Sequence, residues 1–287
     1  MRMTRRELVT LGGALAAAEI GPEGFARADG GAPSPAVNPV FLTGRKTDWP
    51  LRELAAAGFR GLELTPDCLE EGGRAAAAAG LQVVAVDALP ELRPYLTGSL
   101  SDAVAWRRRS TLDRLRKAME WMGAHGASYL IVAPSRQAEN YQSAQDARAL
   151  LVESLRDLAG AGPSAVLLEA APFRLFDRAS EIASIVDEVA KPNVAAALDL
   201  GHTLLAGESP EAAARTLGAR LRFVHLHDAD VRKGFPRLDR HGVPGTGSLD
   251  RGEARAAIGG LPFAVSVASP DDPVGAAART LKWLAQG

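Results

Sequence analysis

The chain has 287 residues, of which 47% are hydrophobic and 23% are charged, which is enough apolar material for one large domain or at most two small ones. Its formal net charge of −1 offers no bulk attraction to nucleic acids, and a nucleic-acid partner is not expected. No run of roughly eighteen or more apolar residues follows the N-terminal region, and no membrane span is expected. The single cysteine, Cys68, has no partner for an internal disulfide bond and is interpreted as a small core residue.

Residues 1–28 resemble a twin-arginine export signal. Arg5 and Arg6 precede a mildly apolar run, LVTLGGALAAA, and the sequence Ala-Arg-Ala that ends at Ala28 offers a small-x-small cleavage site. This signal predicts a periplasmic or secreted protein. Glu19 interrupts the apolar stretch, and the alternative is an ordinary capped helix in a cytoplasmic protein.

Residues 29–38, rich in Gly, Pro and Ala, are predicted to form a linker, and residues 39–287 the folded domain. In this domain short apolar runs alternate with amphipathic stretches of helical period. Most of the runs are continuously apolar, as expected of strands buried on both faces of a parallel sheet. We predict strands at Pro39–Thr43, Gly61–Thr65, Leu81–Val86, Ser128–Ala133, Ala165–Glu169, Val194–Leu200, Arg222–His227 and Phe263–Ala268, and helices at Leu51–Ala57, Arg107–His125, Ala144–Ala159, Ala179–Val189 and Glu211–Leu217.

Eight strands that alternate with helices over about 250 residues have the size and order of a (β/α)8 TIM barrel, an α/β fold. The main alternative is an open doubly wound sheet, but no G-x-G-x-x-G motif follows any of the predicted strands. The sequence therefore predicts a single closed barrel, with its catalytic residues at the carboxyl ends of the strands.

Carboxylate and imidazole side chains gather where the later strands are predicted to end. Converging on one mouth of a barrel, they would form a natural site for a divalent cation. Each of them taken alone is equally compatible with a helix cap or a hydrogen-bonded core residue. They are Glu169 in VLLE, Asp199 and His202 in DLGH, His225 and His227 in VHLHD, and Asp239 and His241 in DRH.

These motifs resemble the xylose isomerase-like superfamily. The resemblance is carried by Glu at the end of the fifth strand, D-x-x-H after the sixth, H-x-x-D at the seventh, and the loop D-R-H-x-x-P-G-x-G-x-x-D that ends at Asp250. The segment GFRGLEL at residues 58–64 and the sequence KPNV before the sixth strand also match. The superfamily includes sugar and sugar-phosphate isomerases, epimerases, and the apurinic-site endonuclease IV branch.

The resemblance implies a metal site for this chain. Glu169, Asp199 and His225 would hold a divalent cation, for which Mn, Mg, Zn and Co are all suitable. His202 would meet a substrate hydroxyl or phosphate, or a further metal together with Asp239 and His241, which match the positions of an extra zinc in the endonuclease branch.

Glu63 ends the second predicted strand, where it faces the barrel mouth. There it would suit a hydrogen bond to a sugar hydroxyl. The alternative is a salt bridge to an arginine of a neighbouring strand.

The sequence departs from the family pattern after the eighth strand, where S-V-E is expected. It reads Ser266-Val267-Ala268, and one metal ligand and one of two acid–base carboxylates are therefore missing together. A DNA-repair role is not expected. The resemblance to the endonuclease branch would imply histidine ligands at the ends of the third and fourth strands, and these strands end in Asp87 and Pro134.

Three interpretations of the function stay open. The first is a divalent-metal-dependent isomerase or epimerase acting on a small sugar or sugar phosphate, with Glu169 as base and His202 or His227 as acid. The second is a non-catalytic barrel that binds a carbohydrate or another protein, with or without a metal. The third is a metal-dependent hydrolase or lyase with water at the open metal position. A homo-oligomer is compatible with each of them.

Overall fold

The structure is a computed structural model, and it describes residues 34–88, 99–135, 143–172, 174–231 and 239–286. The export signal expected over residues 1–28 lies outside the described residues. None of the helices in the described ranges is long and apolar enough to cross a membrane.

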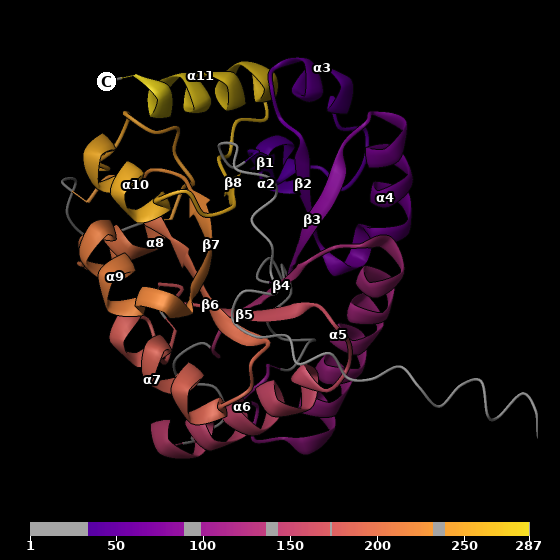
Figure 1. The fold of residues 1–287 in the computed structure, drawn as a ribbon, viewed down its shortest axis with the longest axis vertical. Helices are drawn as coiled ribbons and strands as arrows, with labels where there is room; N and C mark the ends of the chain where they lie inside the picture. The colour runs from indigo at the N-terminus through magenta and orange to yellow at the C-terminus, as the bar shows by residue number, and fades with distance from the viewer. Residues whose placement is uncertain (1–33, 89–98, 136–142, 173, 232–238, 287) are drawn as a thin grey trace, which may run out of the picture. The chain divides into compact units, whose positions relative to one another are not determined.

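Within the described residues, eight parallel strands close into a barrel in their sequence order (Figure 1). The barrel closes where β1 pairs with β8, with Ala36 opposite Ala264 and Val37 opposite Val265. This confirms the predicted TIM barrel. The strands are β1 (Ala36–Val37), β2 (Gly61–Leu64), β3 (Gln82–Asp87), β4 (Tyr129–Val132), β5 (Ala165–Glu169), β6 (Val194–Asp199), β7 (Leu221–Leu226) and β8 (Phe263–Val265).

Helices connect the strands and lie around the outside of the barrel (Figure 1). The five helices predicted from amphipathic stretches all form, with ends that differ by two residues at most. The helical elements are α2 (Pro39–Thr43), α3 (Leu51–Ala56), η1 (Pro66–Cys68), α4 (Leu69–Ala78), α5 (Ala105–His125), α6 (Ala144–Ala159), α7 (Ala179–Val189), α8 (Leu200–Leu205), α9 (Pro210–Leu217), η2 (Gly218–Arg220), α10 (Arg251–Ile258) and α11 (Pro273–Ala285).

The first strand differs from the prediction, which was wrong. Pro39–Thr43 forms helix α2, and the strand is Ala36–Val37, from the segment expected to be a linker. Asn38 caps the helix by accepting a hydrogen bond from the Phe41 N–H at 3.2 Å. Pro39 suits the first helical position, because it has no N–H to donate and its φ is already helical. A short apolar run does not by itself distinguish a buried strand from a buried helix.

The barrel interior has an apolar floor beneath the polar mouth. Phe223 of β7 is fully buried, and its ring lies 5.4 Å from the ring of Tyr129 on β4. His225 follows two residues later and therefore faces the same interior, with its ring 5.5 Å from that of Phe223. Cys68 is also buried, as expected. The imidazole of His225 thus packs on a buried aromatic ring, and this surrounding of low polarity strengthens its electrostatic interactions.

The loop after β7 is folded onto the mouth by one carboxylate. Asp228 accepts hydrogen bonds from the backbone N–H groups of Gly245, Gly247 and Leu249, at 3.0, 2.7 and 2.8 Å. A Cβ atom at Gly247 would lie 2.4 Å from an Asp228 oxygen, and glycine is therefore required there. The loop ends where Asp250 caps α10 by accepting the Glu253 N–H at 3.0 Å.

Replacing Asp228 with Ala would leave three backbone N–H groups without their acceptor. The bond to Leu249 is buried and the other two are part-buried. Because an unsatisfied buried polar group costs about 1–3 kcal/mol, we expect the free energy of unfolding to fall by at least about 1–3 kcal/mol. Urea denaturation measures this loss. The control is Asp187→Ala, which removes an exposed ion pair with Arg220 and should cost less than about 1 kcal/mol. Equal losses in the two variants would contradict the role given to Asp228.

Candidate metal centre

The structure brings all the predicted site residues together at the carboxyl ends of the strands. They form two adjoining groups, which we call the histidine cluster and the carboxylate cluster. The histidine cluster consists of His202, His227, Asp239 and His241, and the carboxylate cluster consists of Glu63, Glu169, Asp199 and His225.

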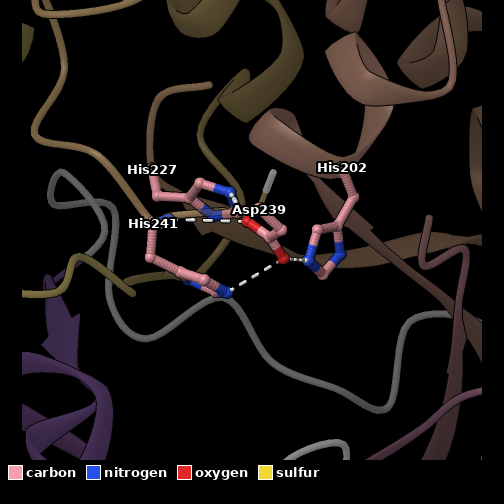
Figure 2. A group of neighbouring side chains, drawn as sticks. All are labelled: His202, His227, Asp239 and His241. Atoms are coloured by element: carbon pink, nitrogen blue, oxygen red, sulfur yellow. Dashed lines mark hydrogen bonds and ion pairs between the residues drawn. The ribbon is translucent and has the colours of Figure 1, made fainter. Parts of the chain in front are cut away.

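In the histidine cluster three imidazoles surround the carboxylate of Asp239 (Figure 2). One Asp239 oxygen lies 2.9 Å from Nε2 of His202 and 3.3 Å from Nε2 of His241. The other oxygen lies 3.3 Å from Nε2 of His227. The ligand atoms of the four residues all lie within 4.8 Å of one another. The rings of His227 and His241 stack with their centroids 4.0 Å apart.

Two local features of the chain place His202 and His227. Asp199 caps α8 by accepting the His202 N–H at 2.9 Å, which fixes His202 in the first turn of that helix. Gly201, which precedes His202 in the chain, leaves room for the imidazole of His227, since a Cβ atom at position 201 would lie 2.0 Å from Nε2 of His227. The sequence DLGH is therefore adapted to bring these two imidazoles together.

His241 is held in place from several sides. It has a positive φ of 47°, a conformation that costs energy for a non-glycine residue. Its ring stacks on Phe41 with centroids 4.2 Å apart, and its Nδ1 donates to the Ser266 carbonyl at 2.6 Å. Its own carbonyl accepts the Ala268 N–H at 2.8 Å. These contacts fix the tautomer of His241 with Nε2 directed at Asp239.

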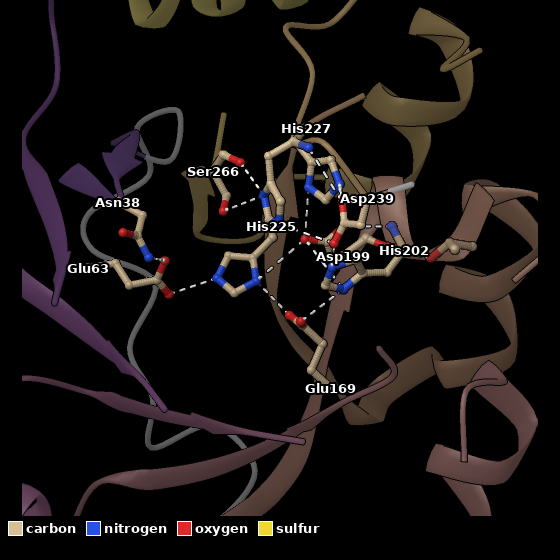
Figure 3. A network of polar contacts seen from close by, with 11 residues as sticks. Asn38, Glu63, Glu169, Asp199, His202, His225, His227, Asp239 and Ser266 are labelled. Carbon is tan, nitrogen blue, oxygen red and sulfur yellow. Dashed lines mark hydrogen bonds and ion pairs between the residues drawn. The ribbon is translucent and has the colours of Figure 1, made fainter. Parts of the chain in front are cut away.

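Three residues of the carboxylate cluster, Glu169, Asp199 and His225, lie at or near the ends of the neighbouring strands β5, β6 and β7, and Glu63 contacts His225 from β2 (Figure 3). Asp199 of β6 and His225 of β7 are directly opposite in register. His225 Nδ1 lies 2.6 Å from an oxygen of Glu169 and 3.9 Å from an oxygen of Asp199. One ligand atom from each of Glu169, Asp199 and His225 lies within 4.8 Å of the other two. The three residues that the family resemblance assigns to the metal therefore converge.

Glu63 holds the opposite edge of the His225 ring. One of its oxygens lies 2.7 Å from His225 Nε2, and the other accepts a hydrogen bond from the side-chain amide of Asn38 at 3.0 Å. Glu63 is fully buried, and both its oxygens have protein partners. Its contact with a sugar hydroxyl stays a prediction.

Two residues of this site were not predicted from the sequence. Asn38 lies in the segment expected to be a linker. Its position directly before Pro39 was the signal that could have identified it as a helix cap. Asp87, at the end of β3, has a ligand atom within 4.8 Å of those of Glu63 and His225. Its position at the end of a buried strand was the signal that could have identified it.

Opposite charges stabilise each other in both clusters against the cost of burial. Burial disfavours the charged forms of both Asp199 and His202, but the attraction between the two residues outweighs this effect. As a result the pKa of Asp199 is lowered, and the pKa of His202 is raised well above its usual value. The pKa of His227 is raised to about 9 against the effect of burial, chiefly by Asp199. Burial and the neighbouring His227 lower the pKa of His241.

Glu169 and His225 form the second such pair. Burial opposes the charge of Glu169, but the attraction of His225 lowers its pKa below the usual value. Burial likewise opposes the charge of His225, and the attraction of Glu63 and then Glu169 raises its pKa well above the usual value. In this arrangement the protons on the imidazoles balance the buried carboxylates. A divalent cation would take over that role and release protons as it binds.

Several buried polar atoms of the site have no hydrogen bond. In the described part of the chain, six buried side-chain nitrogen and oxygen atoms have no hydrogen-bond partner, and four of these belong to the site. They are Oε1 of Glu169, Nδ1 of His202, and both ring nitrogens of His227. Each of them lies 3.1–3.4 Å from a group of opposite charge, so that they are ion-paired without forming a hydrogen bond. Their concentration makes this part of the mouth the candidate place for a ligand.

The profile of one protein family, described as xylose isomerase-like TIM barrel, matches residues 51–286. Comparison of the sequence with curated proteins returns no match. Solved structures with a similar fold include 3-keto-D-glucoside 4-epimerase from E. coli, which is 19% identical with a TM-score of 0.65, over 82% of this chain and 92% of that chain. A D-tagatose 3-epimerase-like protein is 15% identical with a TM-score of 0.72, over 88% and 97% of the two chains. The IolI protein, solved with a bound zinc atom, is 17% identical with a TM-score of 0.71, over 88% and 98%.

At these identities the likeness to solved structures shows the fold alone. The family match extends over most of the chain and includes every residue of the histidine and carboxylate clusters. The chain therefore belongs to the xylose isomerase-like TIM barrel family.

Proposed function

We propose that this protein is a divalent-metal-dependent isomerase or epimerase that acts on a sugar or sugar phosphate. The observation that carries the proposal is the convergence of Glu169, Asp199 and His225, with Oε1 of Glu169 buried and without a hydrogen bond. Two structural neighbours, the 3-keto-D-glucoside 4-epimerase and the D-tagatose 3-epimerase-like protein, support the choice of substrate class.

The residues of the carboxylate cluster suit a divalent metal. Glu169, Asp199 and His225 supply two carboxylates and an imidazole, a donor set that Mn, Mg, Zn and Co accept. When bound, the metal would hold two neighbouring oxygens of the substrate and polarise its carbonyl group. His225 would offer Nδ1 to the metal, because Nε2 already donates to Glu63.

The proton transfers are assigned to residues of the two clusters. Glu169 would take the proton from the carbon beside the carbonyl group, since the low pKa of Glu169 keeps it ionised. Nδ1 of His202 lies 3.4 Å from Oε1 of Glu169 and could return a proton. Nδ1 of His227 lies 3.1 Å from Asp199 and is the second candidate acid.

Ala268 stands where the family pattern has a second carboxylate. It lies just beyond β8, its side chain is exposed, and its N–H donates to the carbonyl of His241. We attribute to the imidazoles of His202 or His227 the proton transfer that this carboxylate would perform. A centre with three protein ligands also suits the activation of water, and a hydrolase or lyase is therefore the second candidate function.

The base assignment predicts the effect of Glu169→Gln. Incubating the metal-loaded protein with a panel of ketoses and ketose phosphates in D2O should place deuterium on the carbon beside the carbonyl group, detected by NMR. The substitution should slow this exchange at least about 100-fold, because the amide cannot accept the proton. The control Glu188→Gln changes an exposed residue paired with Arg148 and should leave the rate unaltered. Absence of exchange with Mn, Mg, Zn and Co alike would contradict an isomerase.

The contact between Glu63 and His225 predicts a loss of metal affinity in Glu63→Gln. An amide cannot accept from both His225 and Asn38, which would disturb the orientation of the imidazole. We expect the metal to bind about 10–100-fold more weakly, as measured by competition with a chromophoric chelator. Glu53→Gln, on the exposed side of α3, serves as the control. Unchanged affinity in Glu63→Gln would rule out this orienting role.

Introducing a carboxylate at position 268 tests whether Ala268 occupies the position of a metal ligand. Ala268→Glu should tighten metal binding about tenfold or more, because a fourth ligand joins the three present. Ala268→Gln adds a side chain of the same length without the charge and should have little effect. If Ala268→Glu binds metal no better than Ala268→Gln, position 268 is not a vacant ligand position.

A further inference from the structure

We propose that the exposed face of α5 binds an organic phosphate of nucleotide type. Its flat ring would stack on the indole of Trp106, and its phosphate groups would lie along the cationic side chains that follow on the same helix. The proposal goes beyond the proposed function and does not rest on it, since the residues concerned belong to neither the histidine cluster nor the carboxylate cluster.

A pocket on the surface of α5 supplies the space. Its volume of about 480 Å³ lies within the range of roughly 300–1,000 Å³ that is usual for small-molecule sites. α5 lies on the outside of the barrel (Figure 1), and because it follows β3, its first turns lie at the same end of the barrel as the mouth. The described residues that line the pocket are Trp106, Arg109, Ser110, Asp113, Arg114 and Lys117.

Trp106 gives the pocket an aromatic surface. It is 62% exposed, whereas the other large hydrophobic residues of the described ranges are buried or half-buried. Tryptophan is enriched at binding surfaces, because one rigid ring offers a large apolar contact area. The guanidinium of Arg107 lies 5.5 Å from the centroid of the Trp106 ring, which restrains the indole and adds a positive charge beside it. The exposed indole is therefore oriented to stack on a flat ring.

The lining of the pocket has an excess of positive charge. Arg109 and Lys117 are exposed, and neither side chain forms an ion pair within the described part of the chain. Asp113, four residues from each of them, pairs instead with Arg116 at 2.6 Å, so that its charge is already balanced. Arg114 is half-buried in the same lining. Three cationic side chains on one face of α5 thus attract an anion.

The start of α5 departs from the usual preference for acidic residues. Its first turn contains none, and the N-cap residue Val104 makes no side-chain hydrogen bond to the helix. Arg107, Arg108 and Arg109 lie near this end, although cations are unfavourable at the positive end of the helix dipole. Arg108 is held by donating to the carbonyl of Asp102 at 2.7 Å. A bound anion would relieve the repulsion that remains, since it is attracted by the cations and by the dipole together.

The order of these groups along α5 selects the class of ligand. Trp106 and Lys117 are eleven residues apart, which corresponds to about 16 Å along the helix axis. The aromatic ring stands at one end of this length, and Arg109, Arg114 and Lys117 follow in turn towards the other. A nucleoside triphosphate has the same order, with a flat base at one end and a chain of anionic groups at the other. Inorganic phosphate would meet the cations and leave Trp106 without a contact.

The experiment titrates the full chain, stripped of metal beforehand, with ATP in a calorimeter. Adenosine and tripolyphosphate are titrated separately, because they carry the ring and the charges alone. We expect ATP to bind more tightly than either. Trp106→Ala should weaken the binding of ATP at least about fivefold through loss of stacking, and should leave the binding of tripolyphosphate unaltered. Trp106→Phe, which keeps an aromatic ring, should retain most of the affinity for ATP.

A second variant tests the charges. Arg109→Gln combined with Lys117→Gln should weaken the binding of ATP and of tripolyphosphate alike, at least about fivefold at low ionic strength, and should reduce the dependence on salt. The matched control combines Arg52→Gln and Lys282→Gln, which remove two exposed charges from α3 and α11.

Three results would overturn the proposal: ATP fails to bind, ATP binds no more tightly than tripolyphosphate, or either the Trp106→Ala variant or the double charge variant binds ATP as the wild type does. None of these readouts depends on isomerase activity.

Discussion

The imidazole of His225, held between two buried carboxylates, is the interaction on which the site depends. Glu63 on β2 and Glu169 on β5 contact its two ring nitrogens at 2.7 and 2.6 Å, so that this one ring links strands on different sides of the barrel. All three side chains are buried, and the His225 ring packs against Phe223, so that each of these contacts is stronger than it would be in water. A ring held in this way can offer Nδ1 to a metal without reorienting.

Asp199 joins this interaction to the histidine cluster. Its carboxylate caps α8, lies 3.9 Å from Nδ1 of His225 and lies 3.1 Å from Nδ1 of His227. A change in its charge is therefore felt by both clusters. Asp228 acts as a second organising carboxylate, since it folds the loop that carries Asp239 and His241. Two acidic residues that are not adjacent in sequence thus control the shape of the mouth.

Strand order and strand ends could be predicted from the sequence because they follow from local patterns. Glu169, Asp199 and His225 were found in this way, since buried parallel strands end where polar residues begin. The first strand was missed, since only two residues pair there and an apolar helix follows at Pro39. The contact of Glu63 with His225 could not be predicted, because it crosses the barrel and depends on side-chain reach. The role of Gly201 likewise appears only when His227 is placed against it.

Ala268 and His227 bear on the two clusters in different ways. The family resemblance predicts a carboxylate where Ala268 stands, and without it the set of Glu169, Asp199 and His225 offers two carboxylates and one imidazole. His227 lies between two carboxylates, with its ring nitrogens 3.1 Å from Asp199 and 3.3 Å from Asp239. Because Asp199 also lies 3.9 Å from His225, the buried charges of the two clusters form one continuous network, and a change of protonation at His227 would alter the electrostatic environment of both clusters.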